Sequence, residues 1–335
     1  NAYLADFTSN QTESELFPFT IWTRTIREVL NENQLQLMIN PPCGGVFFLR
    51  EAIAKHLKEF RGMAVLPEQI IVGAGTEYLY GLLIQLLGNE KIYAVENPGY
   101  RKIGKIYQSY KVLCKYIDMD EEGVEISKLE ENQVDIAHIS PSHHYPTGIV
   151  MPVSRRYELL GWASKSENRY IIEDDYDSEL RLSGQPIPTL QSMDVSDKVI
   201  YMNTFTKTLA STVRISYMIL PRELFQQYYK KLSFYSCTVS NFEQYTLAKF
   251  IEEGYFEKHI NRLRNYYHNK RNTIVETIKK SRLNQYVSIS GEEAGAHFLM
   301  KIETKKPQEQ LMENAKAQGI KLSPLSAYYK ENREE

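Results

Sequence analysis

Short apolar runs rich in β-branched residues alternate with longer amphipathic stretches over residues 68–220. Short apolar runs are typical of buried strands, and apolar residues repeated every three or four positions are typical of helices packed on a sheet. Seven runs have the strand pattern: 70–72, 92–95, 112–114, 134–137, 170–172, 199–202 and 214–220. The alternation predicts an α/β fold with a mainly parallel, seven-stranded sheet flanked by helices.

After Pro221 the pattern changes to long helices followed by a smaller α+β unit. Its predicted elements are helices at 222–232, 242–253, 259–280 and 307–318, and strands at 296–302 and 320–322. A further helix is predicted near 21–31. We therefore expect a large α/β domain over residues 46–235, and a smaller domain in which residues 1–45 pack on residues 236–335.

Composition narrows the classes of function. The formal net charge of -2 gives no electrostatic footprint for nucleic acid. Cys43, Cys114 and Cys237 lie far apart and without a Cys-x-x-Cys pair, which argues against a disulfide framework. No run of about 18 apolar residues or signal segment is present, so the sequence predicts a cytoplasmic protein. The opening Asn1-Ala2, without Met, suggests a domain taken from a longer chain.

Lys207 lies in a hydroxyl-rich segment, 203–210, directly after a predicted strand. Open α/β sheets bind ligands at the carboxyl ends of their strands. A neutral lysine amine attacks an aldehyde, and a cationic neighbour such as Arg214 helps to lower its pKa. The hydroxyls of Thr204 and Thr206, with the paired donors of Arg214, suit a phosphate dianion. A threonine-rich surface turn has a similar composition, so this segment alone leaves both interpretations open.

Three acids and a tyrosine, Glu173, Asp174, Asp175 and Tyr176, follow the apolar run 170–172. A carboxylate facing a pyridine nitrogen keeps that nitrogen protonated, and a phenol can tune an oxygen on the same ring. A metal site or a solvated acidic turn would have the same composition. The position at a strand end favours a binding site.

Gly75 and Thr76 stand where the strand 70–72 gives way to a helix, and free backbone N–H groups at such a junction favour a phosphate. Tyr100 follows another strand end, where its ring could lie on a flat cofactor or simply pack in the core. His143 and His144 are adjacent and cannot easily share a ligand face. Because no Cys or third His lies at metal-ligand spacing, we predict no metal site.

Together these segments resemble the type I fold of pyridoxal-phosphate-dependent transferases. More narrowly, they resemble the aminotransferase-like effector domain of MocR/GabR-type bacterial transcription regulators of the GntR family. The resemblance covers nearly the whole chain. Its motifs are Phe17-Pro18, 49–54 leading to Arg61-Gly62, 96–100, 141–148, 173–179 and 204–214. The turn 142–148, Ser-His-His-Tyr-Pro-Thr-Gly, is similar to the regulators, whereas aminotransferases usually have Asn-Pro-x-Gly.

The resemblance implies that pyridoxal 5'-phosphate is the cofactor and that Lys207 carries it as a Schiff base. Asp174 would pair with the pyridine nitrogen and Tyr176 with O3′, with Tyr100 beside the ring and Tyr145 in place of the usual amide. The implied phosphate contacts are Gly75, Thr76, Thr204, Thr206 and Arg214. An Arg-Leu-Gly-Phe strand that binds the ligand carboxylate in many relatives is not found in this sequence. Lys102, with His144, is a candidate effector contact instead.

The leading hypothesis is a ligand-sensing and dimerisation domain. An amine-bearing effector, such as an amino acid or a dipeptide, would bind at the cofactor and control DNA binding through a helix-turn-helix domain that this sequence does not include. The alternative is a free-standing aminotransferase in which the same lysine is a general base. A third hypothesis is an α/β scaffold without a cofactor. Type I folds usually form their site at a homodimer interface, so the resemblance implies a homodimer.

Overall fold

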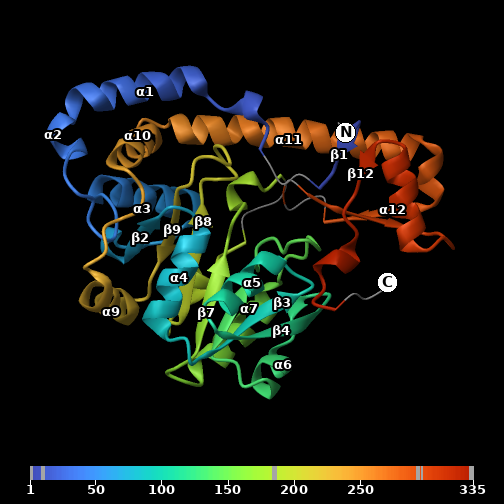
Figure 1. Ribbon diagram of the computed structural model, residues 1–335, viewed down its shortest axis with the longest axis horizontal. Helices are drawn as coiled ribbons and strands as arrows, with labels where there is room; N and C mark the ends of the chain where they lie inside the picture. The colour runs from blue at the N-terminus through green and yellow to red at the C-terminus, as the bar shows by residue number, and fades with distance from the viewer. Residues whose placement is uncertain (1–2, 9–11, 183–186, 292–294, 296, 332–335) are drawn as a thin grey trace.

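The computed structural model describes residues 3–8, 12–182, 187–291, 295 and 297–331. Its centre is an eight-stranded sheet with the strand order β2-β9-β8-β7-β6-β3-β4-β5, shown in Figure 1. These strands are β2 (Ile70–Gly73), β3 (Ile92–Asn97), β4 (Leu113–Asp120), β5 (Gly123–Val124), β6 (Ile136–Ile139), β7 (Tyr170–Asp174), β8 (Val199–Thr204) and β9 (Ser216–Ile219).

The sheet is mainly parallel, as the sequence predicts. Each neighbouring pair from β8 to β4 is parallel, whereas β9 is antiparallel to both β8 and β2. All seven predicted strands lie in the sheet. The eighth, β5, is a two-residue strand that pairs antiparallel with β4. It is too short to give a hydrophobic pattern, which explains why the sequence did not reveal it.

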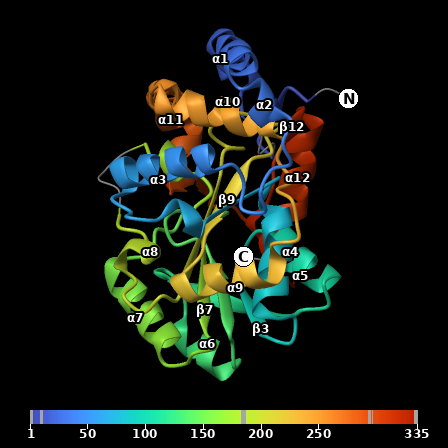
Figure 2. The same ribbon diagram turned by 90° about the vertical axis from the view of Figure 1, so that its left-hand side faces the viewer.

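Helices cover both faces of this sheet. Alternate strand residues point to opposite sides, so each face presents its own apolar side chains for helices to pack against. Tyr201 and Ile171 pack on one face with the helices α3 (Phe47–Arg61), α7 (Val153–Ser164), α10 (Asn241–Glu252) and α11 (Tyr255–Lys280). Ile200 and Ile172 pack on the other face with α4 (Thr76–Leu87), α5 (Arg101–Ser109) and α9 (Arg222–Leu232). Figure 2 shows α3 and α7 on one side of the strands and α4 and α5 on the other. Among the described residues, no helix is long and apolar enough to cross a membrane.

The helices match the predicted ones within a few residues. The sequence pattern also predicts helices at 77–87, 100–110 and 154–166, which correspond to α4, α5 and α7. Of the helices that were not predicted, α2, α6 and α8 are short and α3 is long, and α11 begins four residues before its predicted start at His259. The α-helices are α1 (Phe19–Glu32), α2 (Gln34–Leu37), α3 (Phe47–Arg61), α4 (Thr76–Leu87), α5 (Arg101–Ser109), α6 (Ile126–Glu131), α7 (Val153–Ser164), α8 (Leu190–Met193), α9 (Arg222–Leu232), α10 (Asn241–Glu252), α11 (Tyr255–Lys280) and α12 (Gln308–Ala317).

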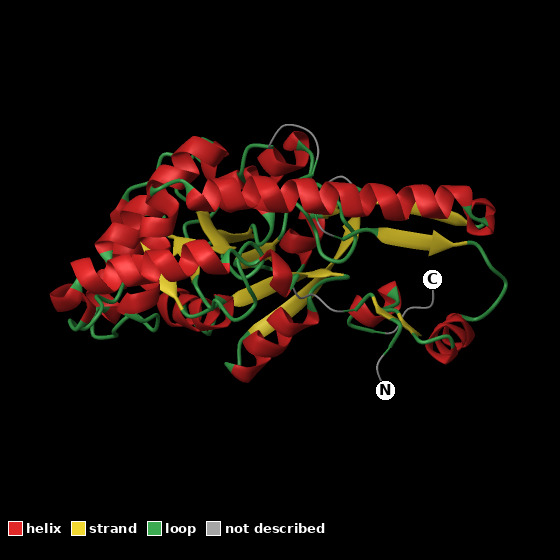
Figure 3. Ribbon diagram, turned by 90° about the horizontal axis from the view of Figure 1, so that it is seen from above, coloured by secondary structure: helices red, strands yellow, loops and turns green. Residues whose placement is uncertain are grey.

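A second group of elements lies beyond the sheet, at the far end of α11. Figure 3 shows α11 running across the molecule, with the main sheet near one end and small strands near the other. β10 (Val287–Ser290) pairs antiparallel with β11 (Leu299–Ile302), and β1 (Ala5–Asp6) pairs parallel with β12 (Ile320–Lys321). The first residue of the predicted strand 296–302 lies outside the described residues. The predicted boundaries between the large and the small domain, at 45–46 and 235–236, stay a prediction.

Five short 3₁₀ helices complete the description. They are η1 (Ser14–Leu16), η2 (Pro67–Gln69), η3 (Ser178–Leu180), η4 (Arg282–Gln285) and η5 (Leu325–Tyr328). Two of them matter for the site. η3 follows β7 directly, and η5 contacts the loop after β3, because Gly99 N–H donates to Tyr328 O at 3.2 Å. The chain's C-terminal part therefore reaches the carboxyl ends of the sheet.

Replacing Leu159 with alanine should destabilise the fold by about 2–5 kcal/mol, because this α7 side chain is fully buried against the sheet and its loss leaves a cavity. Tyr157→Ala on the same helix is the matched control. Its side chain is exposed, so a change within about 0.5 kcal/mol is expected. Urea unfolding followed by circular dichroism measures both. Equal losses of stability would contradict the assignment of α7's buried face.

Candidate functional site

A cavity of about 270 Å³ opens at the carboxyl ends of the central strands. All ten residues that were expected from the sequence to contact the cofactor line it, although their individual roles stay predictions. The lining consists of Gly75, Thr76, Glu77, Tyr80, Val95, Glu96, Gly99, Tyr100, Lys102, Ile103, Ile106, His138, Ser140, Tyr145, Asp174, Tyr176, Thr204, Thr206, Lys207 and Arg214. The topology thus brings together segments that are far apart in the sequence.

Asp174, the last residue of β7, is buried in this cavity. Its Oδ2 accepts a hydrogen bond from the Tyr80 hydroxyl at 3.0 Å and lies 3.5 Å from His138 Nε2. His138 Nδ1 in turn lies 2.7 Å from the Tyr107 hydroxyl. Asp174 Oδ1 is buried and has no hydrogen-bond partner. One carboxylate oxygen is therefore fixed from behind, while the other is left for a group in the cavity.

Hydroxyls and an arginine gather at one end of the cavity. Thr204 Oγ1 donates to Thr206 Oγ1 at 2.9 Å and accepts from Ser216 Oγ at 2.8 Å. Gly75 has a φ of +90°, and a Cβ there would lie 2.5 Å from Arg214 Nη2. Glycine is thus required both for the backbone conformation and for the approach of the guanidinium. Together with the N-terminus of α4, these donors form a cradle suited to a phosphate.

Lys207 lines the cavity after β8, and burial lowers the pKa of its amine to about 8. From the sequence, Arg214 was expected to cause such a shift. That attribution is wrong, because the lowering arises from loss of water around the amine, and the charge of Asp177 acts in the opposite direction by raising the pKa. A buried lysine with a lowered pKa supplies a neutral amine at mildly alkaline pH, as attack on an aldehyde requires.

The donor set fits pyridoxal phosphate. The Tyr176 hydroxyl is buried without a hydrogen-bond partner, as Asp174 Oδ1 is, and both line the same cavity as Lys207. Burial raises the pKa of Tyr176 well above its ordinary value, so the phenol stays protonated and can donate. The cofactor is an aromatic ring with a basic nitrogen, an aldehyde and a phosphate. The cavity has one complementary group for each of these features.

Lys102 lies at the cavity but is held by another residue. Its amine contacts the Glu77 carboxylate, which also lies 3.5 Å from Arg214 Nη2. The hydrogen bond from Lys102 lowers the pKa of Glu77. Glu77 was not among the candidate residues from sequence. A ligand carboxylate that binds Lys102 therefore has to compete with an existing ion pair, and the role of Lys102 as an effector contact stays a prediction.

His144 does not line the cavity. Its Nε2 lies 3.5 Å from Glu96 Oε2, and its Nδ1 lies 2.6 Å from Thr147 Oγ1. Burial lowers the pKa of His144 to about 3, so the ring is neutral. Glu96 does line the cavity, and burial raises the pKa of its carboxyl to about 8. It accepts the Ser140 N–H at 3.0 Å and so ties β3 to the turn after β6.

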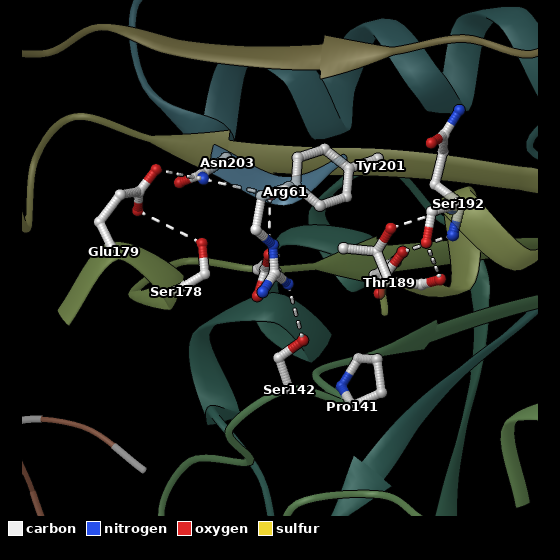
Figure 4. Close-up of polar contacts among 12 residues, drawn as sticks. Arg61, Pro141, Ser142, Ser178, Glu179, Thr189, Ser192, Tyr201 and Asn203 are labelled. Carbon is white, nitrogen blue, oxygen red and sulfur yellow. Dashed lines mark hydrogen bonds and ion pairs between the residues drawn. The ribbon is translucent and has the colours of Figure 1, made fainter. Parts of the chain in front are cut away.

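Beneath the cavity lies a buried polar network, shown in Figure 4. Arg61 donates to Asp175 Oδ2 at 2.8 Å and to Ser142 Oγ at 3.4 Å. The Tyr201 hydroxyl donates to the same Asp175 oxygen at 2.7 Å, and Asn203 donates to Glu179 at 3.1 Å. These bonds join the end of α3 to β7, β8 and the turn after β6. They fix the strand ends that carry the cavity residues.

A third histidine lies beside His143. The rings of His143 and His297 are stacked with their centroids 4.1 Å apart, and His143 Nδ1 lies 2.7 Å from Asp177 Oδ2. The three residues place one potential ligand atom each within 4.8 Å of one another. Sequence spacing gave no sign of this, because His297 comes from a distant segment. The absence of a metal site, expected from the sequence, therefore stays a prediction.

Sequence reasoning missed Tyr80, His138, Glu96 and Glu77. Tyr80 lies on a helix face and His138 in a strand, and both segments have the pattern of ordinary core. Only the structure shows that the two side chains approach Asp174 and line the cavity. Glu96 offered a signal, since an acid that directly follows the apolar run of β3 lies at a strand's carboxyl end. The rule that drew attention to Asp174 applied equally to Glu96.

The fold is that of the class I and II aminotransferases. The family model "Aminotransferase class I and II" matches residues 4–333. Among solved structures, the kynurenine aminotransferase of Pyrococcus horikoshii, in complex with PMP, is 25% identical and has a TM-score of 0.84. That alignment covers 98% of this chain and 83% of the other. These findings confirm the type I fold and pyridoxal phosphate as the cofactor expected from the sequence.

Similar sequences narrow the family further. The uncharacterized HTH-type transcriptional regulator YdeL of Bacillus subtilis is 38% identical over 98% of this chain and 71% of its own length. The probable rhizopine catabolism regulatory protein MocR of Rhizobium meliloti is 30% identical over 95% of this chain and 64% of its own length. The chain belongs to the class I and II aminotransferase family and, within it, to the aminotransferase-like part of MocR-type transcription regulators.

Glu96→Gln should make stability less dependent on pH. The folded carboxyl has a pKa of about 8, above its ordinary value, so the folded protein keeps a proton that the unfolded chain loses between about pH 4.5 and 8. Wild-type stability therefore falls across this range. The variant's free energy of unfolding, relative to wild type, should rise by on the order of 2 kcal/mol from pH 5 to pH 8.

Denaturant unfolding at both pH values measures this effect. Glu167→Gln is the control, because Glu167 is exposed on the surface and its loss should give the same small difference at both pH values. A Glu96→Gln effect that is equal at pH 5 and pH 8 would contradict the protonated, buried state of Glu96.

Proposed function

We propose that this chain is the effector-sensing and dimerisation domain of a pyridoxal-phosphate-binding transcription regulator. An amine-bearing small molecule, such as an amino acid or a dipeptide, binds in the cavity beside the cofactor. The domain passes that event to a helix-turn-helix domain, and so controls DNA binding. Two copies of the chain associate, because type I folds usually form their site at a homodimer interface.

The observation that carries this proposal is the match to transcription regulators. Sequence similarity at 30–38% identity extends over at least 95% of the chain for YdeL and MocR. The cavity has nevertheless kept the chemical groups that a cofactor needs. Ligand sensing explains why a domain found in regulators retains a complete cofactor site, because the cofactor's aldehyde gives selective recognition of primary amines.

Each part of the cavity has a role in this proposal. Lys207 would hold the cofactor, and Asp174 Oδ1 would accept a hydrogen bond from its ring nitrogen. The Tyr176 hydroxyl would donate to the ring oxygen. Thr204, Thr206, Arg214 and the N-terminus of α4 would bind the phosphate. When bound, the cofactor supplies an electrophilic carbon and an electron-accepting ring. The protein's own residues orient it and exclude water around it.

A free-standing aminotransferase is the second candidate. It is favoured by the solved aminotransferases, two of which are 25% identical to this chain with TM-scores of 0.84 and 0.86. Lys207, with its lowered pKa, could also act as a base in such an enzyme. The two functions share a cavity and differ in the fate of the bound amine. A sensor holds its ligand, whereas an enzyme turns over.

Purified chain mixed with pyridoxal phosphate should show a visible absorption band, and Lys207→Ala should lose or alter it. Bonding to the amine of Lys207 shifts the absorption of the cofactor to longer wavelength, and alanine has no amine to form that bond. Titration with single amino acids and dipeptides should shift the band of the wild type. With a keto acid present, the shifted spectrum should persist, because the sensor does not recycle its ligand.

Two results would count against this function. Sustained turnover of an amino donor with a keto acid, at roughly 1 to 10³ per second, is enzyme speed and would make the chain an aminotransferase. No band on the protein after unbound cofactor has been removed would instead favour a scaffold without a cofactor. Arg222→Ala serves as the control variant, because Arg222 lies at the start of α9 and not in the cavity lining, and it should leave the spectrum unchanged.

A further inference from the structure

The C-terminal segment 325–330, which includes η5 and which we call the strap, lies against the loop that follows β3. That loop lines the cavity through Gly99 and Tyr100. Backbone groups of the strap form hydrogen bonds with this loop and with the first residue of α5. These bonds join Lys330 N to Asn97 Oδ1 at 3.0 Å, Gly99 N to Tyr328 O at 3.2 Å, and Arg101 Nη1 to Ala327 O at 3.2 Å. The strap is therefore anchored without the side chain of Tyr328.

The side chain of Tyr328 connects the strap to the cavity. Its Oη lies 2.8 Å from Oη of Tyr145, which lines the cavity, and the two rings meet edge-on with their centroids 5.3 Å apart. Ser323 Oγ donates to Tyr328 Oη at 3.1 Å. Each hydroxyl has one proton to donate, and hydrogen bonds that run in one direction along such a chain strengthen one another. The favoured direction is therefore from Ser323 through Tyr328 to Tyr145, which leaves the proton of Tyr145 for an acceptor in the cavity.

Tyr145 and Tyr176 pack on one pair of histidine rings. His143 and His297 are stacked with their centroids 4.1 Å apart. Tyr176 stacks on His143 at 6.3 Å, and Tyr145 meets His297 edge-on at 5.1 Å. Burial raises the pKa of both phenols above the ordinary value, so both stay protonated and can donate. Two phenol donors thus lie on the same side of the cavity, where the Tyr176 hydroxyl has no hydrogen-bond partner in the described part of the chain.

The turn that carries Tyr145 is held in place by its neighbours. A Cβ on Gly148 would lie 2.8 Å from Gly291 Cα, so the turn touches the residue after β10 through two glycines. The ring of Tyr100 meets that of Tyr145 edge-on at 6.1 Å. Burial lowers the pKa of His297 to about 2, so this ring brings no charge to Tyr145. Packing therefore fixes the ring of Tyr145, and hydrogen bonding decides the direction of its hydroxyl proton.

We propose that Tyr328 is a positioning residue for the cofactor: it accepts from Ser323, donates to Tyr145, and so directs the Tyr145 proton at the ring oxygen of bound pyridoxal phosphate. Tyr145 then acts beside Tyr176 on the same oxygen. This inference rests on the cofactor site of the proposed function, and it extends that site by a residue of the C-terminal part. A displacement of the strap accordingly changes how well the cofactor's ring oxygen can hold a negative charge.

The effect of this hydroxyl chain on the cofactor has a definite sign. The ring oxygen becomes more negative when the bound cofactor loses a proton, and a donor to that oxygen stabilises the deprotonated form. The visible band follows this change, so a stronger donor lowers the pH of its midpoint. No covalent bond changes, and no proton leaves Tyr145. Without Tyr328, the Tyr145 hydroxyl is a weaker donor and can turn away from the cavity.

A pH titration of the visible band measures this midpoint on the full chain, loaded with pyridoxal phosphate and freed of unbound cofactor. Tyr145→Phe removes the donor and should raise the midpoint by about one pH unit. Tyr328→Phe keeps the ring and removes only the hydroxyl, and it should raise the midpoint by about half a unit. The double variant should have the midpoint of Tyr145→Phe alone, because Tyr328 acts only through Tyr145.

Two further variants separate the hydroxyl of Tyr328 from the position of the strap. Arg101→Ala removes one anchor of the strap, the bond to Ala327 O, and leaves the hydroxyl chain intact. It should leave the midpoint unchanged. Ser323→Ala removes the first donor of the chain and should shift the midpoint in the same direction as Tyr328→Phe, by a smaller amount.

The double variant gives the deciding result. A Tyr328→Phe shift that disappears in the Tyr145→Phe background, with the Arg101→Ala midpoint unchanged, supports the proposal. Equal midpoints for wild type and Tyr328→Phe overturn it, and so do shifts that add in the double variant. An Arg101→Ala shift as large as that of Tyr328→Phe assigns the effect to the position of the strap and overturns it as well. The absence of any band on the loaded wild type would contradict the cofactor site, and with it both the proposed function and the role of Tyr328.

Discussion

The buried ion pair between Arg61 and Asp175 is the constraint on which the site depends. Arg61 ends α3, and Asp175 follows β7, so the pair joins a helix of one layer to the strand that carries the site. Because successive residues alternate in direction, Asp175 points down to Arg61 while its neighbours Asp174 and Tyr176 line the cavity. Removing either partner would leave an unpaired buried charge, which typically costs about 3–5 kcal/mol. The same pair therefore ties α3 to the end of β7 and orients the residues there that line the cavity.

The sequence was sufficient for the longer strands of the sheet and for ten of the residues that line the cavity. Most of the parallel strands contain a short apolar run, and polar side chains that line the cavity follow such runs at the carboxyl ends, as with Asp174 at the end of β7 and Lys207 after β8. β5 and β10 were missed because two residues, or four half-exposed ones, do not make a hydrophobic pattern. The pattern of apolar residues predicts a strand only when the strand is long and buried.

The environment of each side chain could not be predicted from the sequence. The lowered pKa of Lys207 arises from burial, and burial depends on segments distant from residue 207. The contact of His297 with His143, and the two partners behind Asp174, depend in the same way on chain packing. Adjacent residues can also differ completely, since Glu96 faces the cavity while the next residue, Asn97, pairs with Asp118 at 2.7 Å. Residue type and spacing identify a site, and packing determines what that site does.

The central claim is that Lys207 is the residue that holds the cofactor in a regulator's sensing domain. The most direct measurement is to incubate the chain with pyridoxal phosphate, reduce it with borohydride to fix the cofactor to its lysine, and map the modified peptide by mass spectrometry. We predict that modification concentrates on Lys207 and is lost in Lys207→Ala. Modification spread over surface lysines such as Lys279 and Lys280, with Lys207 unmodified, would contradict this claim.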